Sequence, residues 1–249
     1  VLQHITEFCI SGLGKEKVLE ISPIHNKRQL FKELNLVDEY LSSFQSENRV
    51  PNHNFDNISS SIKRLAIENS FIETDAFLKI ATTSLTINEL IKFFKKFKIQ
   101  FPAFFELSQK IEFTTYIDDE IKKIIEISGE VKNNASSTLK QLRKDINNVR
   151  GKIGASFSSA LSKAIAAGYL DDIKETVVDN QRVLAVSAMH RRKVAGSLLG
   201  SSKSGNIVYI APQATLTYSR EYQNLIYDEK QEVVKILRDL STTIRPMVS

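Results

Sequence analysis

No glycine occurs in residues 15–128, and this gap limits the possible folds more than any other feature of the sequence. Only two prolines, Pro51 and Pro102, fall in residues 30–127. Because glycine and proline are the residues that most often interrupt helices, this stretch is predicted to be mostly helical. Its apolar residues recur at three- and four-residue spacing, which is typical of amphipathic helices packed on one another. Two such series are Leu30, Leu34, Val37 and Tyr40, and Phe77, Ile80, Leu85 and Leu90.

A narrow apolar stripe continues through residues 131–164. Its members are spaced by three or four residues and are Leu142, Ile146, Val149, Ile153, Phe157, Ala160 and Ala164. A stripe this thin predicts a long helix that leans on one partner over several turns. A second long helix is predicted over residues 216–249. We expect the two to pair, with Ile146 and its neighbours facing Val233 and Leu237.

Between these helices the hydrophobic period changes to two residues. Short β-prone runs at residues 183–186, 194–199 and 207–210 are separated by polar segments rich in arginine, serine and glycine. This pattern predicts antiparallel strands joined by tight turns. Two long helices separated by only about fifty residues of strand and turn can run antiparallel as an arm that carries the strands. The predicted fold is therefore mainly α, with a helical bundle, a long helical pair and a small antiparallel β element.

The positive charge of the chain is local. The formal net charge is +5, but residues 140–204 hold twelve Lys and Arg against five Asp and Glu. Basic side chains on an exposed element are suited to contact phosphates, which need charge and reach more than a shaped pocket. The candidate nucleic-acid contacts are Lys174, Arg182, Arg191, Arg192, Lys193 and Lys203. The alternative is that these residues only solubilise a helix and an exposed loop.

The sequence lacks the patterns of common catalytic centres. Residues 200–205 have the glycine spacing of a phosphate-binding loop but continue with Asn206 instead of Lys and Ser or Thr. The acidic run at residues 118–120 could hold a cation, although acidic groups at a helix start usually offset the helix dipole. Cys9 and four histidines give no zinc spacing. The chain is predicted not to be an enzyme, to hold no cofactor or metal, and neither to bind ATP tightly nor to hydrolyse it.

Membrane insertion and secretion are not expected. No apolar run approaches the roughly 20 residues that cross a bilayer, and residues 1–10 lack the basic region and cleavage site of a secretory signal. We therefore expect a cytoplasmic protein without a membrane partner.

Four segments carry a more specific pattern. They are residues 127–143 (ISGEVKNNASSTLKQLR), 182–187 (RVLAVS), 193–196 (KVAG) and 204–212 (SGNIVYIAP). Together they resemble the second MutS family, the bacterial MutS paralogue linked to recombination control. The similarity extends to LGKE at residues 13–16, so it spans essentially the whole chain.

This resemblance implies a core, a lever of long helices and a clamp, in proteins that dimerise and close around nucleic acid. Residues 1–128 would be the core, 129–166 and 216–249 the lever, and 167–215 the clamp. The implied partner is double-stranded or branched DNA, with RNA or the ribosome left open. Family members continue into an ATPase domain that uses ATP and Mg²⁺, and many end in a nuclease domain. We therefore expect a fragment of a longer protein.

The chain also departs from the family. Mismatch-reading MutS proteins carry an amino-terminal domain that wedges a phenylalanine into the duplex, whereas this sequence starts in the helical core, so we expect no mismatch recognition. In the clamp, GSSKS at residues 200–204 and YIAP at residues 209–212 replace more acidic family segments. The leading hypothesis is a DNA-clamping segment of the mismatch-repair and recombination-control family. The alternative is a coiled-coil-like scaffold that dimerises or docks on a protein or ribosome.

Overall fold

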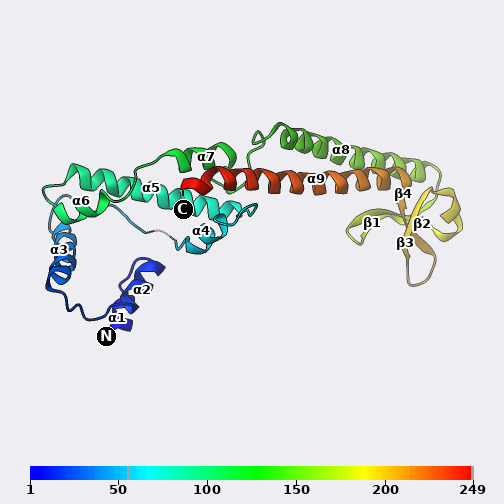
Figure 1. Cartoon of the computed structure of the whole chain (residues 1–249). Helices are drawn as coiled ribbons and strands as arrows, with labels where there is room; N and C mark the ends of the chain where they lie inside the picture. The colour runs from blue at the N-terminus through cyan, green and yellow to red at the C-terminus, as the bar shows by residue number, and fades with distance from the viewer. Residues whose placement is uncertain (55, 248–249) are drawn as a thin grey trace. The chain divides into compact units, whose positions relative to one another are not determined.

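The structure, a computed structural model, describes residues 1–54 and 56–247 (Figure 1). The chain divides into two compact units, Val1–Ala135 with Val234–Ser249, and Ser136–Val233. Helices predominate and the strands of the described part form a small antiparallel sheet, so the predicted fold class is confirmed. Two residues of the predicted return helix, Val248 and Ser249, lie outside the described residues. No helix in the described ranges combines the length and hydropathy needed to cross a membrane.

The first unit is built from helices, as the glycine-free stretch predicts. α5 (Thr74–Lys96) is contacted by α6 (Pro102–Ser108) and α7 (Tyr116–Ile124). The remaining elements are α1 (Leu2–Thr6), α2 (Gly12–Leu19), α3 (Lys27–Ser43), α4 (Ser59–Leu65) and the 3₁₀ turn η2 (Arg245–Met247). Buried apolar side chains from several of these helices and from Phe101, the residue before α6, form the core, among them Leu65, Phe77, Ile80 and Ile121.

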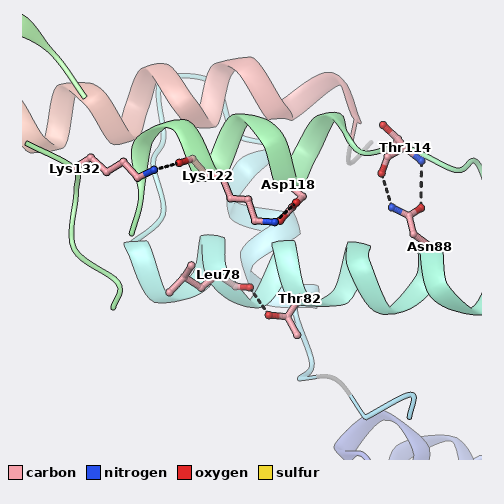
Figure 2. A network of polar contacts seen from close by, with 7 residues as sticks. All are labelled: Leu78, Thr82, Asn88, Thr114, Asp118, Lys122 and Lys132. Atoms are coloured by element: carbon pink, nitrogen blue, oxygen red, sulfur yellow. Dashed lines mark hydrogen bonds and ion pairs between the residues drawn. The ribbon is translucent and has the colours of Figure 1, made fainter. Parts of the chain in front are cut away.

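Polar contacts hold the segment before α7 against α5, and a further ion pair lies within α7 (Figure 2). The Asn88 side chain of α5 donates to the Thr114 carbonyl oxygen at 2.7 Å and accepts from the Thr114 amide at 3.3 Å. In α7, Lys122 Nζ pairs with Asp118 Oδ2 at 2.6 Å. Asp118 and Asp119 lie in the first turn of α7, where negative charge offsets the helix dipole.

The second unit contains an antiparallel helical pair. α8 (Ser137–Ala166) runs beside the first part of α9 (Gln213–Ile244), of which residues 213–233 belong to this unit (Figure 1). Three side-chain contacts fix the register. Ser136 Oγ lies 2.7 Å from Glu232 Oε1, Arg143 Nε lies 2.7 Å from Glu229 Oε1, and Ser156 Oγ lies 3.2 Å from Thr215 Oγ1.

Two details of the predicted pair are corrected by this register. α8 begins at Ser137, eight residues after the predicted start at residue 129, because the chain before it makes an antiparallel bridge between Ile125 and Val131. Val233 follows Glu232 and is therefore level with the start of α8, not with Ile146. Counting back along α9 from Glu229, which meets Arg143, places Leu225 and Ile226 opposite Ile146 instead.

The β element is a four-stranded antiparallel sheet in the order β1-β2-β4-β3. Its strands are β1 (Leu170–Val178), β2 (Gln181–Ser187), β3 (Gly196–Ser201) and β4 (Ile207–Pro212). The last three correspond to the predicted runs. β1 was not predicted, because an edge strand with two aspartates, a glutamate and a lysine lacks a clear apolar alternation. The segment predicted as a turn after β2 is the 3₁₀ helix η1 (Ala188–Lys193).

One face of the sheet packs on the carboxyl-terminal half of α8. Alternate residues Leu184 and Val186 of β2, with Val208 and Ile210 of β4, form a buried cluster with Phe157 and Ala164 of α8. Alternation places residues two apart on the same face of a strand. This packing fixes the sheet at the end of the helical pair and determines which basic side chains can meet.

Candidate nucleic-acid interface

Three of the six predicted contact residues form one exposed basic run. Arg191, Arg192 and Lys193 end η1, and each is exposed. No ion pair engages any of the three within the described ranges. Their charges therefore face solvent uncompensated by a carboxylate, as a phosphate contact requires.

Backbone hydrogen bonds hold both ends of this run. The Ala188 amide donates to the Asn206 carbonyl oxygen at 2.8 Å, and the Gln213 amide donates to the Ala195 carbonyl oxygen at 3.1 Å. The first bond places the start of η1 against the β3–β4 turn. Lys203 is exposed in that turn, so the structure brings it to the same end of the sheet as the start of η1.

Arg182 lies elsewhere and has structural partners. It shares a face of β2 with Leu184 and Val186, and its guanidinium carbon lies 4.1 Å from the centroid of the Phe157 ring. Its Nη2 also pairs with Glu175 Oε2 of β1 at 2.7 Å. Arg182 thus stands at the opposite end of β2 from η1, with its charge partly balanced.

Lys174 is the most isolated of the predicted residues. It is exposed in β1, in the stretch where the pairing with β2 is irregular between Leu170 and Glu175. Its Nζ donates to the backbone carbonyl oxygen of Asp171 at 3.0 Å. The structure does not group Lys174 with the basic run at η1.

Sequence reasoning missed Arg150 and Arg220. Together with Arg182 they line an open groove of about 940 Å³ between the helical pair and the sheet. Arg150 comes from α8 and Arg220 from α9, so 70 residues of chain separate them. No local motif links residues this far apart, and only the pairing of α8 with α9 brings them together.

A second basic hollow lies between α8, α9 and the segment after η1. It has a volume of about 700 Å³, and its lining includes Lys163, Lys193, Tyr169 and Tyr218. Lys152 Nζ lies 5.7 Å from the centroid of the Tyr218 ring, and Tyr169 packs on His190 with ring centroids 5.0 Å apart. Lys193 therefore borders this hollow as well as ending the basic run.

The segment at residues 200–205 does not have the surroundings of a phosphate-binding loop. Residues 200–205 span the end of β3 and the β3–β4 turn, whereas a phosphate-binding loop leads into a helix whose amides face the phosphates. Over the residues that the structure describes, no group of three or more His, Cys, Asp or Glu could hold a metal ion.

No protein-family model matches the chain. It is similar to a protein named Endonuclease MutS2 from Lactobacillus helveticus (strain DPC 4571), with 26% identity over 251 residues that cover 100% of this chain and 32% of that protein. The protein of the same name from Alkaliphilus oremlandii is 25% identical over 246 residues, covering 98% of this chain and 31% of its own length. That from Pelotomaculum thermopropionicum is 24% identical over 244 residues, with the same coverage.

These relatives are about three times longer than the aligned region, since the chain spans 31–32% of their length. The match covers both compact units of this chain. The similarity thus supports a relationship between this chain and a region of MutS2-type proteins.

Proposed function

We propose that this chain is a nucleic-acid-binding segment of a MutS-like protein, in which residues 136–233 form a helical arm with a basic clamp at its end. The observation that carries the proposal is the exposed run of Arg191, Arg192 and Lys193. No carboxylate pairs with its charges among the described residues. Backbone hydrogen bonds of Ala188 with Asn206 and of Ala195 with Gln213 hold the segment that contains it in place. Charges presented in this way suit phosphate contacts that are indifferent to base sequence.

The helical pair supports the mechanical part of the proposal. α9 is an unbroken helix of 32 residues whose first part belongs to the second unit and whose last part belongs to the first. A helix of that length extends roughly 48 Å at about 1.5 Å per residue. The proposed lever transmits movement along α9 between the clamp and an ATPase domain outside this sequence, where ATP and Mg²⁺ would bind. Dimerisation around duplex or branched DNA belongs to the same proposal.

A salt titration tests the clamp contact. Arg191, Arg192 and Lys193 are replaced together by alanine, and binding of a fluorescently labelled DNA duplex is measured by anisotropy at several salt concentrations. Affinity should fall for every duplex sequence, and the slope of log K against log salt should flatten by about 0.9 for each phosphate that the variant no longer neutralises. An unchanged affinity and slope would show that the run only solubilises η1. Duplex RNA and ribosomes, titrated in parallel, identify the physiological target class.

A second candidate function is dimerisation through α3. One face of this helix carries large apolar side chains that are 38–57% exposed, namely Leu30, Phe31, Leu34, Val37 and Leu41. A row of exposed apolar residues on one helix favours burial against another protein surface, here a second copy of the chain. Sedimentation of the intact chain distinguishes this candidate. If Leu34→Glu dissociates a dimer and leaves the affinity for duplex DNA unchanged, α3 serves for dimerisation and not for nucleic-acid binding.

A further inference from the structure

The groove lined by Arg150, Arg182 and Arg220, here called the arginine groove, gathers one arginine from each of α8, β2 and α9. Its lining contains no aspartate or glutamate. The polar remainder is neutral and consists of Asn180, Gln181, Ser197, Thr215, Ser219, Tyr222, Gln223 and Asn224. Like charges drawn to one groove repel each other, so this arrangement favours an anionic occupant.

Two of the three arginines have no carboxylate partner among the residues that the structure describes. Arg150 and Arg220 are exposed and make no ion pair with any residue that the structure describes. Arg182 has Glu175 as a counter-charge, and its guanidinium is held over the Phe157 ring. Arg182 is therefore an oriented donor, whereas Arg150 and Arg220 are exposed charges in the groove lining.

The register of the helical pair spaces these charges. Since Ser156 meets Thr215 and Arg143 meets Glu229, residue 220 of α9 is level with residues 151–152 of α8. Arg150 and Arg220 thus lie at nearly the same level of the pair, and both line the groove. The guanidinium of Arg182 lies over the ring of Phe157. Phe157 follows Arg150 by seven residues of α8, which corresponds to about two helical turns or roughly 10 Å along the helix.

We propose that the arginine groove binds the phosphodiester backbone of a nucleic-acid strand, as a second contact distinct from the basic run at η1. A separation of roughly 10 Å exceeds the reach of one phosphate but matches about three steps between successive phosphates, at about 3.4 Å of axial rise each. Guanidinium groups suit this task because their planar donors bind phosphate oxygens in pairs. The inference rests on the proposed nucleic-acid binding and assigns part of it to Arg150, Arg182 and Arg220.

The test compares three variants of the intact chain in the anisotropy titration, with labelled single-stranded and duplex DNA. Arg150→Gln with Arg220→Gln removes the free charges of the groove. Lys144→Gln with Lys230→Gln removes two exposed charges from the same two helices outside the groove and serves as the matched control. Arg150→Lys with Arg220→Lys keeps the charge. Thermal unfolding by circular dichroism verifies that each variant is folded.

The groove variant should bind DNA at least tenfold more weakly than the control at low salt, with a salt slope lower by about two units. The lysine variant should keep most of the slope. If the groove variant matches the control while the η1 triple variant loses affinity, the groove inference fails and the clamp contact stands. If neither the groove variant nor the η1 triple variant loses affinity, the groove inference and the proposed clamp contact both fail. If tripolyphosphate binds the intact chain more tightly than it binds the groove variant, while both bind DNA equally, the groove takes a free anion and the proposal of a nucleic-acid strand fails.

Discussion

The guanidinium of Arg182 lies over the ring of Phe157, 4.1 Å from its centroid, and joins strand β2 to helix α8. Phe157 is itself 1% exposed and belongs to the cluster beneath the sheet. The same guanidinium holds Glu175 of the neighbouring strand at 2.7 Å. A residue selected from the sequence for its charge therefore also joins three elements of the second unit.

Replacing Arg182 by methionine should lower the free energy of unfolding of the second unit by about 1 kcal/mol. A cation over an aromatic face contributes about 0.5–2 kcal/mol, and a largely exposed ion pair contributes about 0–1 kcal/mol. Urea unfolding followed by circular dichroism measures the change. Arg182→Lys keeps the charge and should recover part of the loss; an equal loss in both variants would show that guanidinium geometry, not charge, matters.

The ion pair between Arg143 and Glu229 should couple α8 to α9 measurably. Their side chains are only 27% and 23% exposed, so the pair is screened less than a surface pair. A double-mutant cycle with Arg143→Met and Glu229→Gln should give a coupling free energy of about 1 kcal/mol that declines as salt is added. A coupling near zero would mean that this ion pair does not stabilise the pairing of α8 with α9.

Gly196→Ala should disrupt the β3–β4 pairing. A Cβ at this position would lie 2.2 Å from the Ala211 carbonyl oxygen, a backbone atom that cannot move without separating the strands. Overpacking of this kind costs about 1–3 kcal/mol, measurable as a fall in the unfolding midpoint. Gly200→Ala in the same strand is the control, since its Cβ would meet only the Tyr209 ring at 3.6 Å. Equal stability of the two variants would contradict a backbone held this close to Gly196.

Gly151→Ala should stabilise the chain. Gly151 lies inside α8, and apart from its chain neighbours and the nearby backbone of α8 no atom lies within 4 Å of the place its Cβ would take. Glycine costs about 1 kcal/mol in a helix interior relative to alanine, so the melting temperature should rise. The reverse change at the exposed helical position Ala155, to glycine, should lower it by a similar amount. A melting temperature that falls in Gly151→Ala would indicate that α8 needs a bend there.

Local patterns were sufficient to predict the order of the main parts of the chain, which is a helical stretch, a long helix, strands and a second long helix. The glycine-free stretch predicted helices where α3 to α7 lie, and the apolar stripe through Ile146 and Phe157 predicted α8. Helical and strand periods differ, so they can be read from neighbouring residues without knowledge of the fold. β1 escaped prediction because its charged edge carries little periodicity, and η1 because turns and 3₁₀ helices use similar polar residues.

The sequence by itself determined the fold class and the concentration of positive charge before and within the β element. Only the tertiary structure decided which charges act together. The antiparallel register of α8 and α9 places Arg150 beside Arg220, and the sheet packing on Phe157 adds Arg182 to the same groove. Charge clusters of this kind depend on contacts between distant segments, and such contacts are set by side-chain packing that no local spacing records.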